Sequence, residues 1–111
     1  MELNEYQKKA LTTALYGKQH KIIYPALGLG EEAGEVLGKI KKWLRGDDGE
    51  GGAMSKERLE PLKLELGDVL WYLATLAEDL GFSLEDIAEA NAEKLKSRKE
   101  RGVLKGDGDV R

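Results

Sequence analysis

The sequence of 111 residues predicts an all-α protein, a four-helix bundle that is completed by oligomerisation. Apolar residues recur at helical spacing in four stretches, and capping residues or glycines mark most of the ends of these stretches. The strict alternation of apolar and polar residues that is typical of strands does not occur in the sequence. A chain of this length buries only a modest core, which association with further copies would enlarge.

The first predicted helix covers residues 3–15, with Asn4 as its N-cap and Gly17 as its end. The connector that follows has no readable period. Pro25 suits the first turn of the second helix because its φ is already helical, and Gly46 is a suitable C-cap. The apolar stripe of this second helix consists of Leu29, Ala33, Val36, Leu37, Ile40 and Leu44.

A glycine-rich, acidic stretch at residues 46–55 predicts a mobile loop. Ser55 is expected to cap a short turn that ends at Pro61. The third helix follows this turn and runs to about Leu80, where Gly81 stops it.

Ser83 and Asp86 form a capping box at the start of the fourth helix, which fades near Gly102. We therefore expect a single helical domain over residues 1–102. Residues 103–111 are expected to form a polar tail, because they show no periodicity.

Composition excludes several classes of site. The sequence has no cysteine, so it has no disulfide, zinc–thiolate site or thiol nucleophile. His20 is the one histidine, which argues against a Ser-His-Asp triad. The net charge of −3 gives no support for nucleic-acid binding, and no apolar run is long enough for a membrane span. A soluble, cytoplasmic protein is therefore expected.

The stretch "GLGEEAGEV" at residues 28–36 has two interpretations, a phosphate cradle or half of a metal site. The cradle is disfavoured, because no strand precedes Gly28 and three residues, not two, separate Gly30 from Gly34. The Gly-Lys-Ser/Thr of a P-loop is also missing. The glycines are better explained by close helix packing, or by room for a ligand beside the helix.

Two pairs of acids stand in the same relation to two apolar stripes. On a helical wheel, Glu32 and Glu35 flank the stripe of the second helix, as Glu65 and Asp68 flank that of the third. If the stripes pack together, the pairs face one another, and Mg²⁺ or Mn²⁺ is the cation that such oxygen ligands favour. The alternative is a solvated surface on which Lys39 pairs with Glu35.

The fourth helix places Asn91, Lys94 and Arg98 in line with the apolar residue Ile87. If that helix buries Ile87, basic and amide groups point towards the same interior as the acids. This arrangement suits a polyphosphate ligand bridged by metal. The alternative is that the helix extends beyond the core and that its end is solvated.

The strings "LGEEAGEVLGKIKKW" and "KLELGDVLWYLATLAEDLGFSLEDIAEANAEKLKSR" resemble the MazG family of all-α nucleoside triphosphate pyrophosphohydrolases. The resemblance covers residues 27–101, with its E-x-x-E pair, its E-x-x-D pair and its "N..K...R" run in order. It implies Mg²⁺-dependent cleavage of a nucleoside triphosphate to a monophosphate and pyrophosphate. It also implies a homodimer or homotetramer that clears unwanted nucleotides.

The four acids are accordingly the expected catalytic and metal-binding residues, and one acid not fully engaged by metal, with Glu31 as an outer candidate, would accept a proton. Phosphate oxygens are expected to bind Lys39, Lys42, Lys94 and Arg98. Tyr72 and Trp43 are expected to stack on the base, although Trp43 also fits a core position at the helix end. Asn91 is expected to contact a base edge or the sugar.

The main alternative function is a helical nucleotide- or metal-binding oligomerisation or regulatory module without turnover. A di-iron bundle fits less well, because the sequence lacks Glu-x-x-His. Trp71 lies opposite the stripe of the third helix, so either another helix of the chain covers it or a second subunit does.

Overall fold

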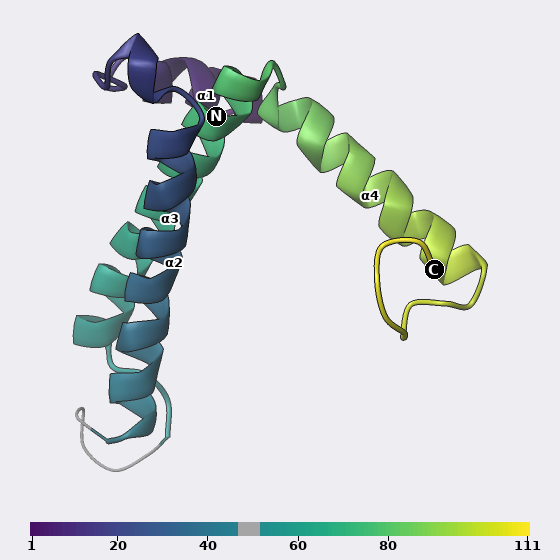
Figure 1. Cartoon of the computed structure of the whole chain (residues 1–111). Coiled ribbons are helices and arrows are strands. Elements are labelled where there is room, and N and C mark those ends of the chain that lie inside the picture. The colour runs from purple at the N-terminus through teal and green to yellow at the C-terminus, as the bar shows by residue number, and fades with distance from the viewer. Residues whose placement is uncertain (47–51) are drawn as a thin grey trace.

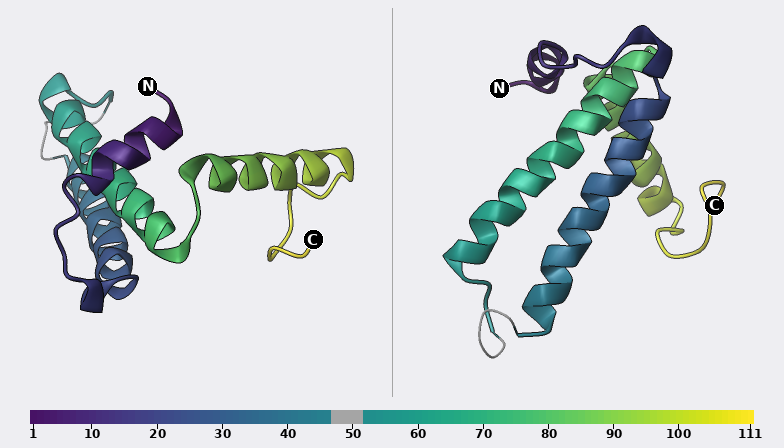
Figure 2. Two further views of the ribbon diagram at one scale, coloured as in Figure 1. Left: turned by 90° about the horizontal axis from the view of Figure 1, so that it is seen from above. Right: turned by 60° about the vertical axis from the view of Figure 1, so that its left-hand side comes forward.

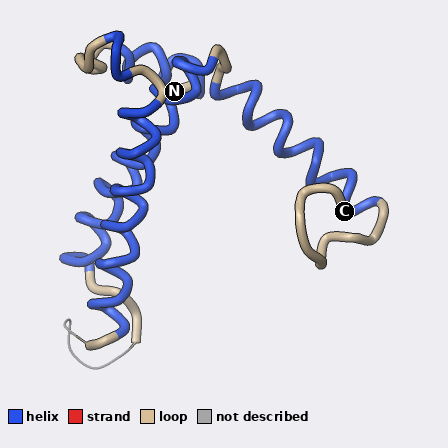
Figure 3. The backbone as a smooth tube through the Cα atoms, in the orientation of Figure 1, coloured by secondary structure: helices blue, strands red, loops and turns tan. Residues whose placement is uncertain are grey.

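The computed structural model describes residues 1–46 and 52–111, and within these ranges it is helical and has no strand (Figure 3). Its elements are α1 (Leu3–Leu11), the 3-10 turn η1 (Lys18–His20), α2 (Ile23–Leu44), α3 (Lys56–Leu80) and α4 (Leu84–Glu100). The predicted all-α fold is therefore confirmed. Residues 47–51, the centre of the predicted glycine-rich loop, lie outside the described residues.

α2 and α3 form an antiparallel hairpin and run side by side (Figure 1). Gly28 permits their close approach, since a Cβ at this position would lie 2.1 Å from the Tyr72 ring. At one end of the hairpin, Asp79 accepts hydrogen bonds from the Ile22 N–H and the Tyr16 hydroxyl, both at 2.9 Å. The hairpin is thus held by packing along its length and by polar contacts at its end.

Most predicted helix ends are confirmed because their signals are local. Pro25 lies in the first turn of α2. Gly46 and Gly81 follow α2 and α3 with φ of 91° and 86°, a left-handed conformation that glycine adopts without strain. The Ser83 hydroxyl accepts a hydrogen bond of 3.0 Å from the Asp86 N–H at the start of α4.

Two predicted boundaries are wrong. α1 ends at Leu11 and not near residue 15, because the hydroxyls of Thr12 and Thr13 bond back to carbonyls of the preceding turn. The turn predicted before Pro61 is part of α3, which begins at Lys56 and continues through the proline. A proline this near a helix start removes one backbone hydrogen bond, and the rest of the helix maintains the geometry.

The assignment of Asn4 as the cap of its own helix is also wrong. Its amide donates to the Glu85 carboxylate at 3.0 Å, and its carbonyl accepts from the Glu85 N–H at 3.2 Å. The buried Gln7 accepts from the Leu84 N–H at 2.9 Å and donates to the Phe82 carbonyl at 3.0 Å. Side chains of α1 therefore satisfy the free N–H groups of α4, a helix distant in sequence.

The core is small and lies where α1, α3 and the start of α4 meet. Its buried apolar residues are Ala10, Ala74, Ala77 and Leu84. Trp71 packs against this cluster, and its indole N–H donates to the Thr13 hydroxyl at 2.8 Å. Within one chain Trp71 is therefore partly covered by an N-terminal segment, and its burial by a second subunit stays a prediction.

Beyond this junction α4 extends away from the hairpin, so that the chain has two arms (Figures 1 and 2). We call α2 and α3 the hairpin arm, and α4 with residues 101–111 the α4 arm. At the C-terminal end the chain turns back towards the last turns of α4 (Figure 1). The candidate site residues are divided between these two arms.

Candidate functional site

Three carboxylates meet on the hairpin arm. Glu32 comes from α2, and Glu65 and Asp68 come from adjacent turns of α3. One oxygen atom of each lies within 4.8 Å of the others. Glu32 and Glu65 are partly buried, whereas Asp68 is exposed. The helices therefore converge on a group of oxygen donors that is open to solvent on one side.

The group concentrates negative charge. The pKa of Glu32 is raised above its ordinary value by partial desolvation, then by a hydrogen bond shared with Glu65 and by the charges of Asp68, Glu65 and Glu31. Lys39 offsets part of this charge, with its ammonium 3.9 Å from a Glu65 oxygen. The lysine thus pairs across the two helices, and not with Glu35 as in the surface alternative.

Glu35, the fourth predicted ligand, lies one turn beyond Glu32 on α2. Its side chain is exposed and it is outside the group of three carboxylates in the described structure. Its assignment to the metal site stays a prediction.

An aromatic pocket adjoins the carboxylates. It has a volume of about 200 Å³ and is lined by Tyr24, Leu27, Gly28, Glu31 and Tyr72. The Tyr24 ring stacks on Tyr16 at 5.0 Å and lies 6.2 Å from Tyr72. Desolvation, followed by the hydrogen bond to Tyr24, raises the pKa of Tyr72 to about 12, so this phenol is neutral at ordinary pH.

Sequence reasoning found Tyr72 but missed Tyr24. Tyr24 belongs to the connector whose period was unreadable, and only the fold brings it to Tyr72. Lys42 and Trp43 lie in the last turn of α2, about 15 Å along the helix axis from Glu32. Their assignment to substrate binding stays a prediction.

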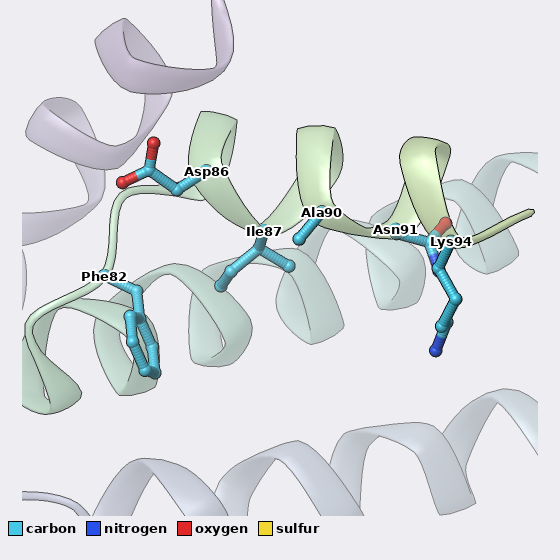
Figure 4. A pocket seen from close by; sticks show the side chains of 6 residues that line it. All are labelled: Phe82, Asp86, Ile87, Ala90, Asn91 and Lys94. Carbon is cyan, nitrogen blue, oxygen red and sulfur yellow. The ribbon is translucent and has the colours of Figure 1, made fainter. Parts of the chain in front are cut away.

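A second pocket, of about 550 Å³, lies on the α4 arm (Figure 4). Its lining residues are Phe82, Asp86, Ile87, Ala90, Asn91 and Lys94. Asn91 and Lys94 share this side of α4 with Ile87, as their spacing predicts. None of the three carboxylates lines this pocket, so the two halves of the predicted site stay apart within one chain.

Arg98, the remaining predicted phosphate ligand, is buried near the end of α4. Its guanidinium contacts the C-terminal residues of the chain and not the pocket on α4. These contacts were not foreseen, because the tail has no periodicity from which its position could be predicted.

Carboxylates from two antiparallel helices give this all-helical fold a set of oxygen donors that suits a divalent cation. The comparison with known families identifies the class of protein. Residues 20–103 match the family model described as "MazG nucleotide pyrophosphohydrolase domain". The chain therefore belongs to this family. This match confirms the resemblance that the paired acidic motifs indicate.

Two relatives extend this finding. The "Gene 37 protein" of Mycobacterium phage L5 is 41% identical over 117 aligned positions, which cover 100% of both chains. The "Uncharacterized protein YvdC" of Bacillus subtilis (strain 168) is 39% identical over 72 positions, covering 63% of this chain and 68% of that protein. No solved structure matches the chain.

Among the described residues, no helix has the length and apolar character needed to cross a membrane.

Proposed function

We propose that this chain is a Mg²⁺-dependent pyrophosphohydrolase that converts a nucleoside triphosphate to the monophosphate and pyrophosphate, and that it clears unwanted nucleotides. The convergence of Glu32, Glu65 and Asp68 within 4.8 Å carries the proposal. Membership of the MazG nucleotide pyrophosphohydrolase family supports it.

The donor set fits a hard divalent cation. The three ligands are carboxylates, which Mg²⁺ and Mn²⁺ accept readily, and neither histidine nor cysteine lies among them. Desolvation raises the pKa of Glu32, and the charges of the neighbouring carboxylates, which Lys39 only partly offsets, raise it further. A bound Mg²⁺ supplies charge screening for the triphosphate and a water of lowered pKa.

We assign the other roles by position. Tyr72 and Tyr24 offer aromatic faces for a base beside the carboxylates. Glu31, which lines the same pocket, accepts a proton from the attacking water. The water oxygen bonds to phosphorus as the bond between the α- and β-phosphates breaks and pyrophosphate leaves. Lys39, Lys94 and Arg98 bind phosphate oxygens, and Asn91 contacts the sugar or a base edge.

We further propose that the active form is a homo-oligomer. One face of α2 is apolar and uncovered, with Ile23, Leu27, Leu37 and Leu44 between 64% and 79% exposed. Gly30 and Gly34 lie on this face, where an added Cβ would meet nothing within 4 Å. A second copy packing here would bury these side chains. In the oligomer we propose, the α4 arm of another subunit brings cations to the carboxylates.

The test is pyrophosphate release from a panel of ribo- and deoxyribonucleoside triphosphates, with Mg²⁺ and with a chelator. We expect release that requires the metal and is lost in Glu65→Gln. Glu60→Gln is the matched control, because this substitution removes the same charge from an exposed position on α3. Nucleotide binding without release from any substrate would instead identify the non-catalytic regulatory module.

A further inference from the structure

Lys94 and Arg98, two of the cations of α4, already hold an anion from the same chain. One Asp109 oxygen lies 3.3 Å from the Lys94 ammonium and 3.2 Å from Arg98 Nη2. The same Nη2 donates to the backbone carbonyls of Asp109 at 3.1 Å and of Gly108 at 3.5 Å. A carboxylate and two carbonyls thus surround the groups to which we assign phosphate binding.

The tail reaches this position through its own hydrogen bonds. Arg111 donates to the carbonyls of Val103 and Leu104, both at 3.2 Å, and Arg101 donates to the Arg111 carbonyl at 2.9 Å. Gly102 and Gly108, with φ of 71° and 76°, make the turns that bring the tail back. Residues 102–111 are therefore a folded loop that presents Asp109 to α4.

The Asp109 carboxylate leaves some hydrogen-bond donors of Lys94 and Arg98 without an acceptor. The Arg98 side chain is only 5% exposed, and its buried Nε has no hydrogen-bond partner among the described residues. A single Asp109 oxygen serves both Lys94 and Arg98. A phosphate group has three strong acceptor oxygens, so it can satisfy donors that this contact leaves unpaired.

We propose that residues 102–111 act as an internal competitor of the substrate, in which the Asp109 carboxylate occupies the place of a phosphate group on Lys94 and Arg98. Polyphosphate binding releases the loop, and loop closure releases product. This inference rests on the proposed role of Lys94 and Arg98 in phosphate binding.

The competition is weak enough to be reversible. The Asp109 side chain is 84% exposed, and an ion pair so open to solvent is readily replaced. The hydrogen bonds to Arg98 and Lys94 lower the pKa of Asp109 below its ordinary value. The carboxylate is therefore ionised at neutral pH and competes directly with other anions.

The experiment measures calorimetric binding of inorganic tripolyphosphate, with excess Mg²⁺, to the wild type, Asp109→Asn and Asp107→Asn. Asp107 is the matched control, because it carries the same charge in the same loop and the ion pairs of Lys94 and Arg98 go to Asp109. We expect Asp109→Asn to bind roughly two- to fivefold more tightly than the other two proteins. Equal affinities for the three proteins, or no binding by any, would overturn the proposal.

Hydrogen exchange of the loop provides a second readout. Tripolyphosphate should accelerate amide exchange in residues 102–111 of the wild type, and binding without this change would also overturn the proposal. Nucleotide cleavage is measured separately. If Asp109→Asn tightens binding and no nucleotide is cleaved, the inference stands and the proposed function fails. If nucleotide is cleaved and Asp109→Asn binds tripolyphosphate no more tightly than Asp107→Asn, the proposed function stands and the inference fails.

Discussion

The hairpin arm and the α4 arm carry different groups of the predicted site and are held in different ways. α2 and α3 pack along their lengths and hold Glu32, Glu65 and Asp68 together. α4 is fastened at its start by α1 side chains, and its remaining turns extend away from the hairpin (Figure 1). The acids thus belong to a packed pair of helices, and the cations to a helix supported at one end.

Each arm also carries one counter-ion of its own. Lys39 lies beside the acids of the hairpin arm, and Asp109 lies beside the cations of the α4 arm. On the hairpin arm, desolvation and then the neighbouring carboxylates raise the pKa of Glu32 in spite of Lys39. On the α4 arm, the buried Nε of Arg98 has no hydrogen-bond partner among the described residues. If the proposed function holds, the two arms complement each other: a metal would complete the hairpin arm, a phosphate would complete the α4 arm, and a metal–triphosphate substrate would join both.

The largest expected effect is on the hairpin arm. Asp68→Asn should lower the rate of Mg²⁺-dependent pyrophosphate release at least about a hundredfold, because an amide replaces an anionic metal ligand. Helicity should persist, since Asp68 is exposed and makes no core contact. Circular dichroism and steady-state kinetics of this variant and of Glu60→Gln check both points. Near-native turnover in Asp68→Asn would contradict the metal-site assignment.

Glu35→Gln determines whether the three carboxylates are the whole ligand set. We expect this variant to lose hydrolysis as well, because Glu35 lies one turn from Glu32 and a metal would draw it inward. The measurement is activity against Mg²⁺ concentration. Retained activity with an unchanged Mg²⁺ requirement would restrict the ligands to Glu32, Glu65 and Asp68.

A smaller effect is expected on the α4 arm. Arg98→Ala and Lys94→Ala should each weaken nucleotide binding by roughly 1.5–3 kcal/mol, the range for a lost charged hydrogen bond. The loss should be the same for every base, since the contact is to phosphate. Titrations with several nucleotides check this, with Lys96→Ala as the control on the same helix. A loss confined to one base would show that these side chains read the base.

Features of the sequence that act locally could be predicted, whereas those created by the fold could not. Ser83 caps the helix that it precedes, and Gly81 ends the helix that it follows. Asn4 has the same capping chemistry, but its partner is Glu85, and a local pattern cannot identify such a distant partner. The spacing on each helix predicted that acids of the second and third helices face one another, and oxygens of Glu32, Glu65 and Asp68 lie within 4.8 Å of one another. The separation of α4 from the hairpin depends on tertiary contacts that no spacing encodes.

Mixing two impaired variants, assayed at a nucleotide concentration too low for Arg98→Ala to bind, tests whether the arms of one site come from different copies. Asp68→Asn has an intact α4 arm, and Arg98→Ala has an intact hairpin arm. If these arms meet across subunits of a homodimer, random exchange restores about a quarter of wild-type activity, because half of the dimers have one intact site of two. The measurement is turnover after unfolding and refolding the mixture. No recovery, with subunit exchange verified by mass, would show that one chain supplies both arms.

The smallest expected effect concerns two glycines of α2 within the hairpin arm. Gly28→Ala should lower the free energy of unfolding by roughly 1–3 kcal/mol, because the new Cβ would lie 2.1 Å from the Tyr72 ring and the packed helices would have to shift. Gly38→Ala should raise it by up to about 1 kcal/mol, since alanine is the better helix former and the new Cβ would meet nothing within 4 Å. Urea unfolding at one fixed protein concentration compares the two variants with the wild type. Changes of opposite sign in the free energy of unfolding of the two variants would show that contact with α3, and not helix propensity, requires Gly28. A gain of stability in both variants would mean that Tyr72 moves aside easily. The packing of α2 on α3 would then not fix the aromatic pocket beside the carboxylates.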